Sequence, residues 1–260
     1  PGSIMLSPHP PGGLAGRIEE AIRARLKGEE PEGARNCGAH QGLDAWPALV
    51  LSLQTTTRPR PIGEAVTVCI VHFNRLTLLR EALASIPHQL EGQPIEVIVI
   101  DNASPFPDIE QEIGKAAGHR PHLRVLTLAK PISSAAAYNR CLAAATNSTV
   151  MFLDDDNAFL PGGVLRLARA LDADNWDIVV SSLDVFDGDS ATNAPSAGRL
   201  IFLGLAHSAG LFFNAFGDTA MAVRRDRFLE LGGFHDPGHA YPSLDWVTLA
   251  KAQAQGFRIG

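Results

Sequence analysis

The sequence TVMFLDDDN, residues 149–157, consists of an apolar run followed by three carboxylates, and it is the basis of the fold that we predict. Its apolar run is short and rich in β-branched and aromatic residues, which favours a buried strand over a short buried helix. The carboxylates of Asp154, Asp155 and Asp156 follow at once, so they lie at the carboxyl end of this strand, where open α/β sheets bind their ligands. Because side chains alternate along a strand, we expect Asp154 and Asp156 on one side and Asp155 on the other.

These carboxylates have two interpretations. Charges this close repel, so one carboxylate takes a proton unless a cation lies among them. A hard divalent ion, Mn²⁺ or Mg²⁺, accepts oxygen ligands and often also binds substrate phosphates. The alternative is a solvated acidic turn in which Asn157 caps a following helix. The acidic triplet alone does not decide between a metal site and a turn.

From Ala65 onward, apolar strand patterns alternate with helical patterns. We expect strands at 66–71, 95–100, 123–128 and 149–153, and helices at 76–86, 109–117 and 134–145. Strands and loops are expected over 176–223, followed by a helix near Arg225 and another over 243–254. Strands separated by helices of this length pair in parallel through right-handed crossovers. The predicted fold class is therefore α/β, with a mostly parallel central sheet flanked by helices.

The residues before this domain have a different character. Residues 1–13 are rich in Pro, Gly and Ser, residues 14–27 have a helical period, and a Pro/Thr-rich linker covers 55–61. We therefore predict a flexible and helical extension with its linker at 1–62, and the α/β domain at 63–260. Because residues 256–260 look like the start of another strand, we expect this domain to be truncated at its C-terminus and to belong to a longer polypeptide.

Composition excludes several classes of protein. The net charge of −6 leaves no basic surface for general nucleic-acid binding. Cys37, Cys69 and Cys141 are too few and too widely spaced for a disulfide framework or a zinc site, and we expect the last two in the core. No apolar run approaches membrane-spanning length. We expect a cytoplasmic protein, with peripheral contact at the inner face of the membrane as an option.

Polar residues follow three of the predicted strands, at 72–75, 101–102 and 154–156. Converging strand ends form a crevice large enough for a nucleotide. No G-x-G-x-x-G follows the first strand, which argues against a dinucleotide-dependent oxidoreductase, and the absence of G-x-x-x-x-G-K-[ST] excludes a P-loop enzyme. The remaining hypothesis is a fold that binds a nucleotide with side chains and one metal ion.

The order and spacing of several segments resemble the signature of family 2 glycosyltransferases, which have the GT-A fold. These segments are VTVCIVHFNR at 66–75, EVIVIDNAS at 96–104, Tyr138-Asn139, FLDDDN at 152–157, Gly217-Asp218 with Arg224-Arg225, Gly232-Gly233-Phe234 and Asp245-Trp246. The resemblance covers about residues 65–260. The stretches HFNR at 72–75 and NAFGD at 214–218 are most like bacterial transferases found in multidomain glycan-assembly proteins.

The resemblance implies a nucleoside diphosphate sugar as donor, UDP- or dTDP-linked, and residues that bind it. Phe73 and its neighbours His72, Asn74 and Arg75 would contact the base, and Asp101 would accept a hydrogen bond from a uracil-like edge. Asn139, Asp154 and Asp155 would complete the nucleotide-sugar site. For Asp101, a capping or turn role is the alternative that the residues themselves leave open.

The resemblance also implies how the reaction proceeds. Asp156, with Asp154, would bind Mn²⁺ or Mg²⁺ at the diphosphate, where the metal acts as a Lewis acid on the leaving group. Asp245 would be the base that deprotonates a glycan or lipid-linked acceptor for direct, inverting displacement. Without the resemblance, Asp245 is equally an acidic residue in the first turn of a helix, where the macrodipole favours it.

Two departures from the family pattern support an alternative function. Leu244 stands where the family has Glu before the base, and Tyr138 stands where Arg is common. A degenerate domain that binds nucleotide-sugar without turnover is therefore the main alternative. A sugar nucleotidyltransferase would need a Gly-rich loop after the first strand, and a phosphatase would carry D-x-D on that strand; the chain has neither feature.

Overall fold

The computed structural model describes residues 65–173, 175–186, 196–204, 210, 213–236 and 243–260. The predicted extension and linker, residues 1–62, and Cys37 within them lie outside the described residues. The domain boundary near residue 62 therefore stays a prediction.

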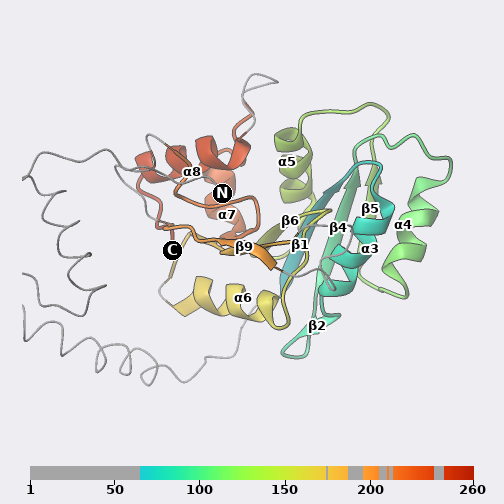
Figure 1. The fold of residues 1–260 in the computed structure, drawn as a ribbon, viewed down its shortest axis with the longest axis horizontal. Coiled ribbons are helices and arrows are strands. Elements are labelled where there is room, and N and C mark those ends of the chain that lie inside the picture. The colour runs from blue at the N-terminus through green and yellow to red at the C-terminus, as the bar shows by residue number, and fades with distance from the viewer. Residues whose placement is uncertain (1–64, 174, 187–195, 205–209, 211–212, 237–242) are drawn as a thin grey trace, which may run out of the picture. The chain divides into compact units, whose positions relative to one another are not determined.

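Within the described residues, six strands form one sheet (Figure 1). Their order is β5 (Leu123–Thr127), β4 (Glu96–Asp101), β1 (Val66–His72), β6 (Thr149–Asp154), β10 (Met221–Arg224) and β7 (Ile178–Val180). The first four strands are parallel, whereas β10 is antiparallel to both β6 and β7. The predicted α/β class with a mostly parallel sheet is confirmed.

Helices cover both faces of this sheet. The first face carries α3 (Leu76–Ser85), α4 (Ile109–Ala117) and α6 (Gly163–Ala173), and the other carries α5 (Ser134–Ala144), α7 (Arg225–Glu230) and α8 (Leu244–Ala254). Figure 1 shows α3 and α4 on one side of the strands and α7 and α8 on the other. In β6, Phe152 packs with α5 and α7, whereas Leu153 packs with α3 and α6. Both faces are buried, which is why the interior of this strand, residues 150–153, is apolar at every position.

The predicted elements agree closely with the structure, with a few additions. The helix α6 was not predicted, nor was the short hairpin of β2 (Gln89–Leu90) and β3 (Gln93–Pro94). In the region predicted as strands and loops, β8 (Leu183–Phe186) and β9 (Ser196–Leu200) pair antiparallel as a separate two-stranded sheet. Residues 258–260 hydrogen-bond alongside β7, in agreement with the predicted strand-like end.

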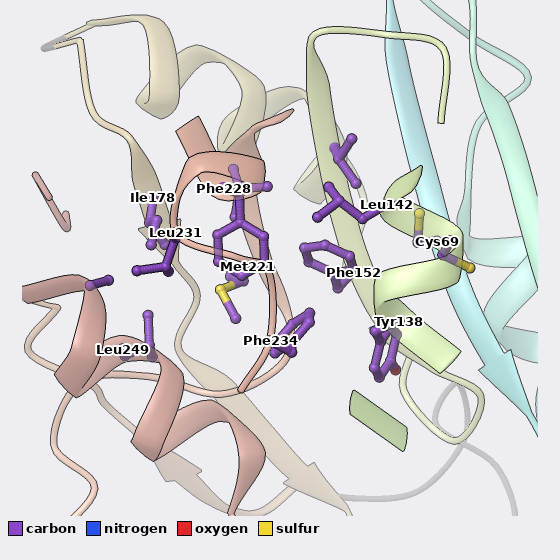
Figure 2. Packing of buried hydrophobic residues seen from close by; sticks show 14 of the residues in the cluster. Cys69, Tyr138, Leu142, Phe152, Ile178, Met221, Phe228, Leu231, Phe234 and Leu249 are labelled. Carbon is purple, nitrogen blue, oxygen red and sulfur yellow. The ribbon is translucent and has the colours of Figure 1, made fainter. Parts of the chain in front are cut away.

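An aromatic cluster fills the core on the α5 face (Figure 2). Phe234 lies at its centre, with its ring centroid 4.8 Å from that of Phe152, 5.2 Å from Phe228 and 5.3 Å from Tyr138. Edge-to-face and tilted pairs at such distances add stability beyond the burial of their area. The Gly-Gly-Phe segment of the sequence signature thus has a packing role.

Both described cysteines, Cys69 and Cys141, are free and buried, as predicted for core residues. None of the described helices combines the length and the apolar character needed to cross a membrane.

Candidate active site

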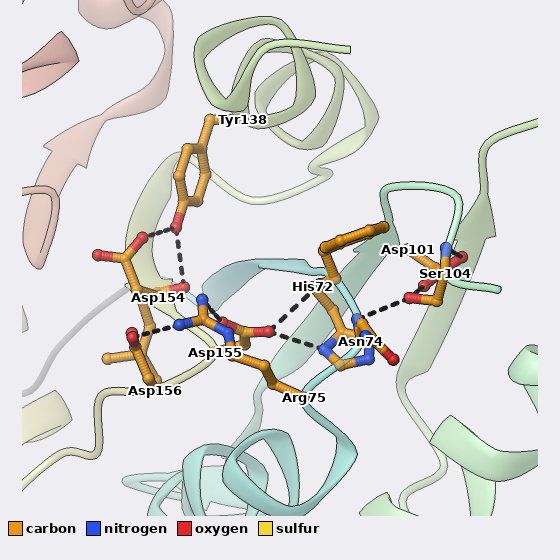
Figure 3. A network of polar contacts seen from close by, with 11 residues as sticks. His72, Asn74, Arg75, Asp101, Ser104, Tyr138, Asp154, Asp155 and Asp156 are labelled. Atoms are coloured by element: carbon orange, nitrogen blue, oxygen red, sulfur yellow. Dashed lines mark hydrogen bonds and ion pairs between the residues drawn. The ribbon is translucent and has the colours of Figure 1, made fainter. Parts of the chain in front are cut away.

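The carboxyl ends of β1, β4 and β6 meet at one edge of the sheet. Their parallel register places His72 opposite Asp101, and Val71 opposite Asp154. The polar residues that follow these strands therefore lie together, as the sequence predicted (Figure 3).

Asp155 is fully buried and is the most heavily bound carboxylate of this edge. It accepts hydrogen bonds from His72 Nδ1 at 2.8 Å and from the Phe73 amide at 3.3 Å, and Arg75 Nη2 forms an ion pair with it. These donors compensate a charge that would be costly to bury alone. His72 is also fully buried, and its Nε2 has no hydrogen-bond partner in the part of the chain that the structure describes.

Arg75 also contacts Asp156, with Nη1 at 2.5 Å from Oδ2. The predicted arrangement, with Asp154 and Asp156 on one side and Asp155 on the other, is wrong for Asp156. The strand β6 ends at Asp154, and Asp155 and Asp156 belong to a turn, so the alternation of side chains does not extend to Asp156. One guanidinium consequently bridges Asp155 and Asp156 (Figure 3).

Asp154 contacts α5, where the Tyr138 hydroxyl donates a hydrogen bond of 2.6 Å to its Oδ1. Burial raises the pKa of Asp154 to about 6, and the charges of Asp218, Asp156 and Asp155 raise it as well, against a lowering by Tyr138. Burial is therefore the main cause of this raised pKa, and the repulsion predicted within the acidic triplet adds to it.

Asp101 is fully buried and forms a turn with Ser104. Its carboxylate accepts a hydrogen bond from the Ser104 amide at 3.1 Å and another from the Ser104 hydroxyl at 2.5 Å. These contacts give Asp101 the turn role that the sequence analysis kept as the alternative. Base recognition by Asp101 stays a prediction.

Phe73 and Asn74 follow β1, and Asn74 lies next to the turn formed by Asp101 and Ser104. The Asn74 amide donates to the Ser104 hydroxyl at 2.9 Å, and its φ of 58° is one that Asn tolerates better than most residues. The Phe73 side chain is about half exposed, at 48%. An exposed aromatic ring at this edge is available to stack on a planar group.

Asn139 lies on α5, and both polar atoms of its side-chain amide form hydrogen bonds with the backbone of Phe234. Its Oδ1 accepts from the Phe234 amide at 2.8 Å, and its Nδ2 donates to the Phe234 carbonyl at 2.8 Å. These contacts are structural, because they fix the turn after α7 against α5. A nucleotide-binding role for Asn139 stays a prediction.

Asp245 lies in the first turn of α8. It accepts a hydrogen bond of 2.7 Å from the Ser243 hydroxyl and one of 3.0 Å from Asn214 Nδ2. Two donors thus fix the orientation of this carboxylate. Leu244, the departure next to it, is partly buried and packs against the aromatic core.

Asp218 is a site residue that the sequence analysis quoted but gave no role. Burial raises the pKa of its carboxyl, the Ala220 amide lowers it in part, and the charges of Asp245 and Asp156 raise it. The charge of Asp218 is in turn one of the causes that raise the pKa of Asp154. Its place in the Gly217-Asp218 segment was the signal available in the sequence.

The side chains of this edge fit a hard divalent cation in their chemistry. Asp156 is 42% exposed, and the carboxyls of Asp154 and Asp218 have pKa values raised by burial and by neighbouring negative charge. Oxygen ligands with uncompensated charge are what Mg²⁺ and Mn²⁺ prefer. Among the residues that the structure describes, no group of three or more His, Cys, Asp or Glu side chains is already arranged to hold a metal ion.

Comparison with solved structures defines the class of fold. The mannosyltransferase PcManGT from Pyrobaculum calidifontis, solved in complex with GDP-Man and Mn²⁺, aligns with a TM-score of 0.55 at 24% identity, over 92% of this chain and 65% of that one. The fold is the GT-A glycosyltransferase fold.

Sequence comparison then gives the family. The profile of glycosyl transferase family 2 matches residues 67–231, which is more than half of the chain, and the chain belongs to this family. It is 26% identical to the uncharacterized glycosyltransferase YwdF of Bacillus subtilis, over 75% of this chain and 69% of that protein. It is 30% identical to the succinoglycan biosynthesis protein ExoU of Rhizobium meliloti, over 49% of this chain and 36% of ExoU. The chain thus spans only part of the length of these relatives.

Proposed function

We propose that this chain transfers a sugar, with inversion, from a nucleoside diphosphate donor to a glycan or lipid-linked acceptor, with Mn²⁺ or Mg²⁺ as cofactor. One observation carries the proposal: the carboxyl ends of β1, β4 and β6 meet at one edge of the sheet, and the acidic triplet follows β6 there. In this proposal the donor binds at the triplet and the acceptor binds beside Asp245.

The donor half of the site would be formed by residues of the β1 and β4 ends. The exposed ring of Phe73 would stack on the base, and Asp101 would accept a hydrogen bond from uracil or thymine. The complex of PcManGT with GDP-Man and Mn²⁺ supports a nucleoside diphosphate sugar and a divalent metal. The similarity to ExoU, a succinoglycan biosynthesis protein, supports a glycan as the acceptor.

Asp156 and Asp154 would hold the metal at the diphosphate. When bound, a divalent ion there supplies Lewis-acid stabilisation of the leaving diphosphate. Tyr138 contributes by orienting Asp154 through its 2.6 Å hydrogen bond. Arg75 contributes positive charge at the same place.

Asp245 would take the proton of the acceptor hydroxyl. Sugar hydroxyls are poor nucleophiles at neutral pH, so a positioned base raises the rate by about 10²–10⁴-fold. Ser243 and Asn214 would keep the carboxylate oriented toward the acceptor while leaving lone pairs free.

The variant Asp245→Asn tests this assignment. Release of UDP from UDP-sugars, measured with a panel of saccharide acceptors, should fall by about 10²–10⁴-fold, while the dissociation constant of UDP with Mn²⁺ stays unchanged. Ser243 can rotate its hydroxyl to accept a hydrogen bond from the new amide, so the melting temperature should change little. A release rate within a few-fold of wild type would return Asp245 to the role of a helix-terminal acid.

The main alternative is a degenerate domain that binds the donor without turnover. It is favoured by Leu244, which packs into the core where the family has an acid. This alternative would be supported if the protein binds a nucleotide-sugar tightly but releases no UDP with any of the acceptors.

A further inference from the structure

Arg75 is the residue just before α3, and it bridges two carboxylates with very different surroundings. The Asp155 side chain is 0% exposed, whereas Asp156 is 42% and Arg75 itself 46% exposed. The same guanidinium therefore makes one buried ion pair and one that faces solvent.

The two contacts differ in how easily they break. Losing Arg75 would leave the buried Asp155 charge with only His72 and the Phe73 amide as partners, and a buried charge that loses a partner is strongly destabilised. Losing the contact between Arg75 and Asp156 exposes both groups to water, and exposed ion pairs contribute little. The guanidinium is thus fixed at its Asp155 end and free to move at its Asp156 end.

We propose that Arg75 is an internal counterion of the acidic triplet: the metal-bound donor displaces it from Asp156 while Asp155 retains it, and its freed nitrogen binds the donor's diphosphate. This inference rests on the proposed function, and it assigns Arg75 a role as the residue that couples metal binding to donor binding. It differs from the base contact that the sequence resemblance implied for Arg75.

The charges of Arg75, the metal ion and the diphosphate determine whether metal binding strengthens or weakens nucleotide binding. A divalent cation on Asp156 would lie within a few ångströms of the guanidinium, and two positive charges at that distance repel. In the absence of nucleotide, Arg75 therefore competes with the metal for Asp156. A diphosphate brings negative charge that attracts both cations, so Arg75 then strengthens the complex. Metal and nucleotide should bind with positive coupling that depends on this one side chain.

Mn²⁺ binding, followed by electron paramagnetic resonance of the free ion, tests the proposal without any measurement of turnover. The proteins compared are wild type, Arg75→Met, Arg75→Lys and the control Arg80→Met, whose side chain is exposed on the same helix α3. Without nucleotide, Arg75→Met should bind Mn²⁺ about tenfold more tightly than wild type. With UDP present, the order reverses, and Arg75→Met should hold UDP and Mn²⁺ about tenfold more weakly. Arg80→Met should match wild type in both measurements.

Arg75→Lys keeps the positive charge but lacks the planar fork that spans two carboxylates. Because the buried partner is the stronger one, Lys should stay with Asp155 and leave Asp156 open, so Mn²⁺ alone binds more tightly than in wild type. This variant carries the test if Arg75→Met melts below the assay temperature.

Equal Mn²⁺ affinity of wild type and both Arg75 variants without nucleotide would overturn the role of Arg75, and UDP binding that still depends on Mn²⁺ would leave the proposed function intact. If no protein of the set binds UDP in a Mn²⁺-dependent way, both the inference and the proposed function are wrong.

Discussion

Asp154, Asp155 and Asp156 are adjacent in the sequence, but each carboxylate has different surroundings. Asp155 is buried among donors, Asp156 shares Arg75 at the surface, and Asp154 is buried against Tyr138 with its pKa raised to about 6. The three carboxylates are chemically identical, so any difference between their roles in the proposed reaction would come from these surroundings.

The raised pKa of Asp154 predicts how replacing this carboxylate changes the free energy of unfolding at different pH values. The folded-state pKa of about 6 lies above the ordinary 3.8, so the folded state binds the proton more tightly. This contribution to stability is complete below about pH 3.8 and is lost as the pH rises through about 6. Asp154→Asn, which can still accept the Tyr138 hydrogen bond, should therefore be more stable than wild type by roughly 2–3 kcal/mol at pH 8.

Urea unfolding at pH 4 and pH 8 in the presence of EDTA measures this difference. Near pH 4 the gain should almost vanish, because Asp154 is then largely protonated in the folded wild type. Asp184, an exposed carboxylate paired with Arg199, supplies the control Asp184→Asn, which should show no gain at pH 8. If Asp154→Asn is more stable than wild type by the same amount at both pH values, the stabilisation comes from packing and not from the loss of the charge.

At the residue scale, the sequence predicted which groups gather at the strand ends but not which of them pair. His72 and Asp155 are 83 positions apart, and Arg75 and Asp155 are 80 apart. No local pattern tells which carboxylate of three becomes buried. The role of Asp218 was missed for the same reason, because its neighbours Asp154, Asp156 and Asp245 come from other elements.

At the scale of elements, the helix α5 is joined to the turn after α7 by Asn139 and Gly233. The φ of Gly233 is +70°, and a Cβ there would lie 2.2 Å from Asn139 Oδ1. The glycine therefore allows both the turn and the close approach of the Asn139 amide to Phe234. This junction places the aromatic core under β6 and supports the position of Asp154.

Asn139→Ala should consequently lower the free energy of unfolding by roughly 1–3 kcal/mol, because the buried amide and carbonyl of Phe234 lose their partners. The dissociation constant of UDP with Mn²⁺, measured by calorimetry, should stay within a few-fold of wild type. Asn139→Asp keeps the acceptor for the Phe234 amide and should be less destabilised. A large loss of UDP affinity without a loss of stability would show instead that Asn139 binds the nucleotide.

Elements with a clear period were predictable, and those without one were not. The strands and helices from 66 to 154 follow from runs of apolar residues and from helical spacing. The helix α6 is an exception, because its buried residues Val164, Ala168 and Leu171 have the spacing of a helix and were still not assigned to one. The strands β2 and β3 have two residues each, too few for any period to appear.

At the scale of the whole molecule, alternating strands and helices determined the parallel part of the sheet. The insertion of β10 between β6 and β7 could not be read from the sequence. It pairs Ala222 with Met151, far away along the chain, through a strand of four residues. The sheet order therefore depends on contacts that only the assembled core selects.

The predicted extension suggests a test at the same scale. A chain that begins at Ile62 should keep the melting temperature of residues 1–260, because the alternating pattern that builds the core begins at Ala65. Differential scanning calorimetry of the two proteins makes the comparison. If the shorter protein melts far lower, Trp46 or the apolar residues 49–51 complete the core.

In the proposed function, the acidic triplet binds a nucleoside diphosphate through a metal ion at Asp156. Calorimetry of UDP binding, with Mn²⁺ or with EDTA, measures this dependence on the metal. Wild type should bind UDP more tightly with Mn²⁺ than with EDTA. Asp156→Ala should lose that difference and still melt near the wild-type temperature, while the exposed control Asp184→Ala should keep it. Mn²⁺-dependent binding of UDP at wild-type strength in Asp156→Ala would contradict the claim.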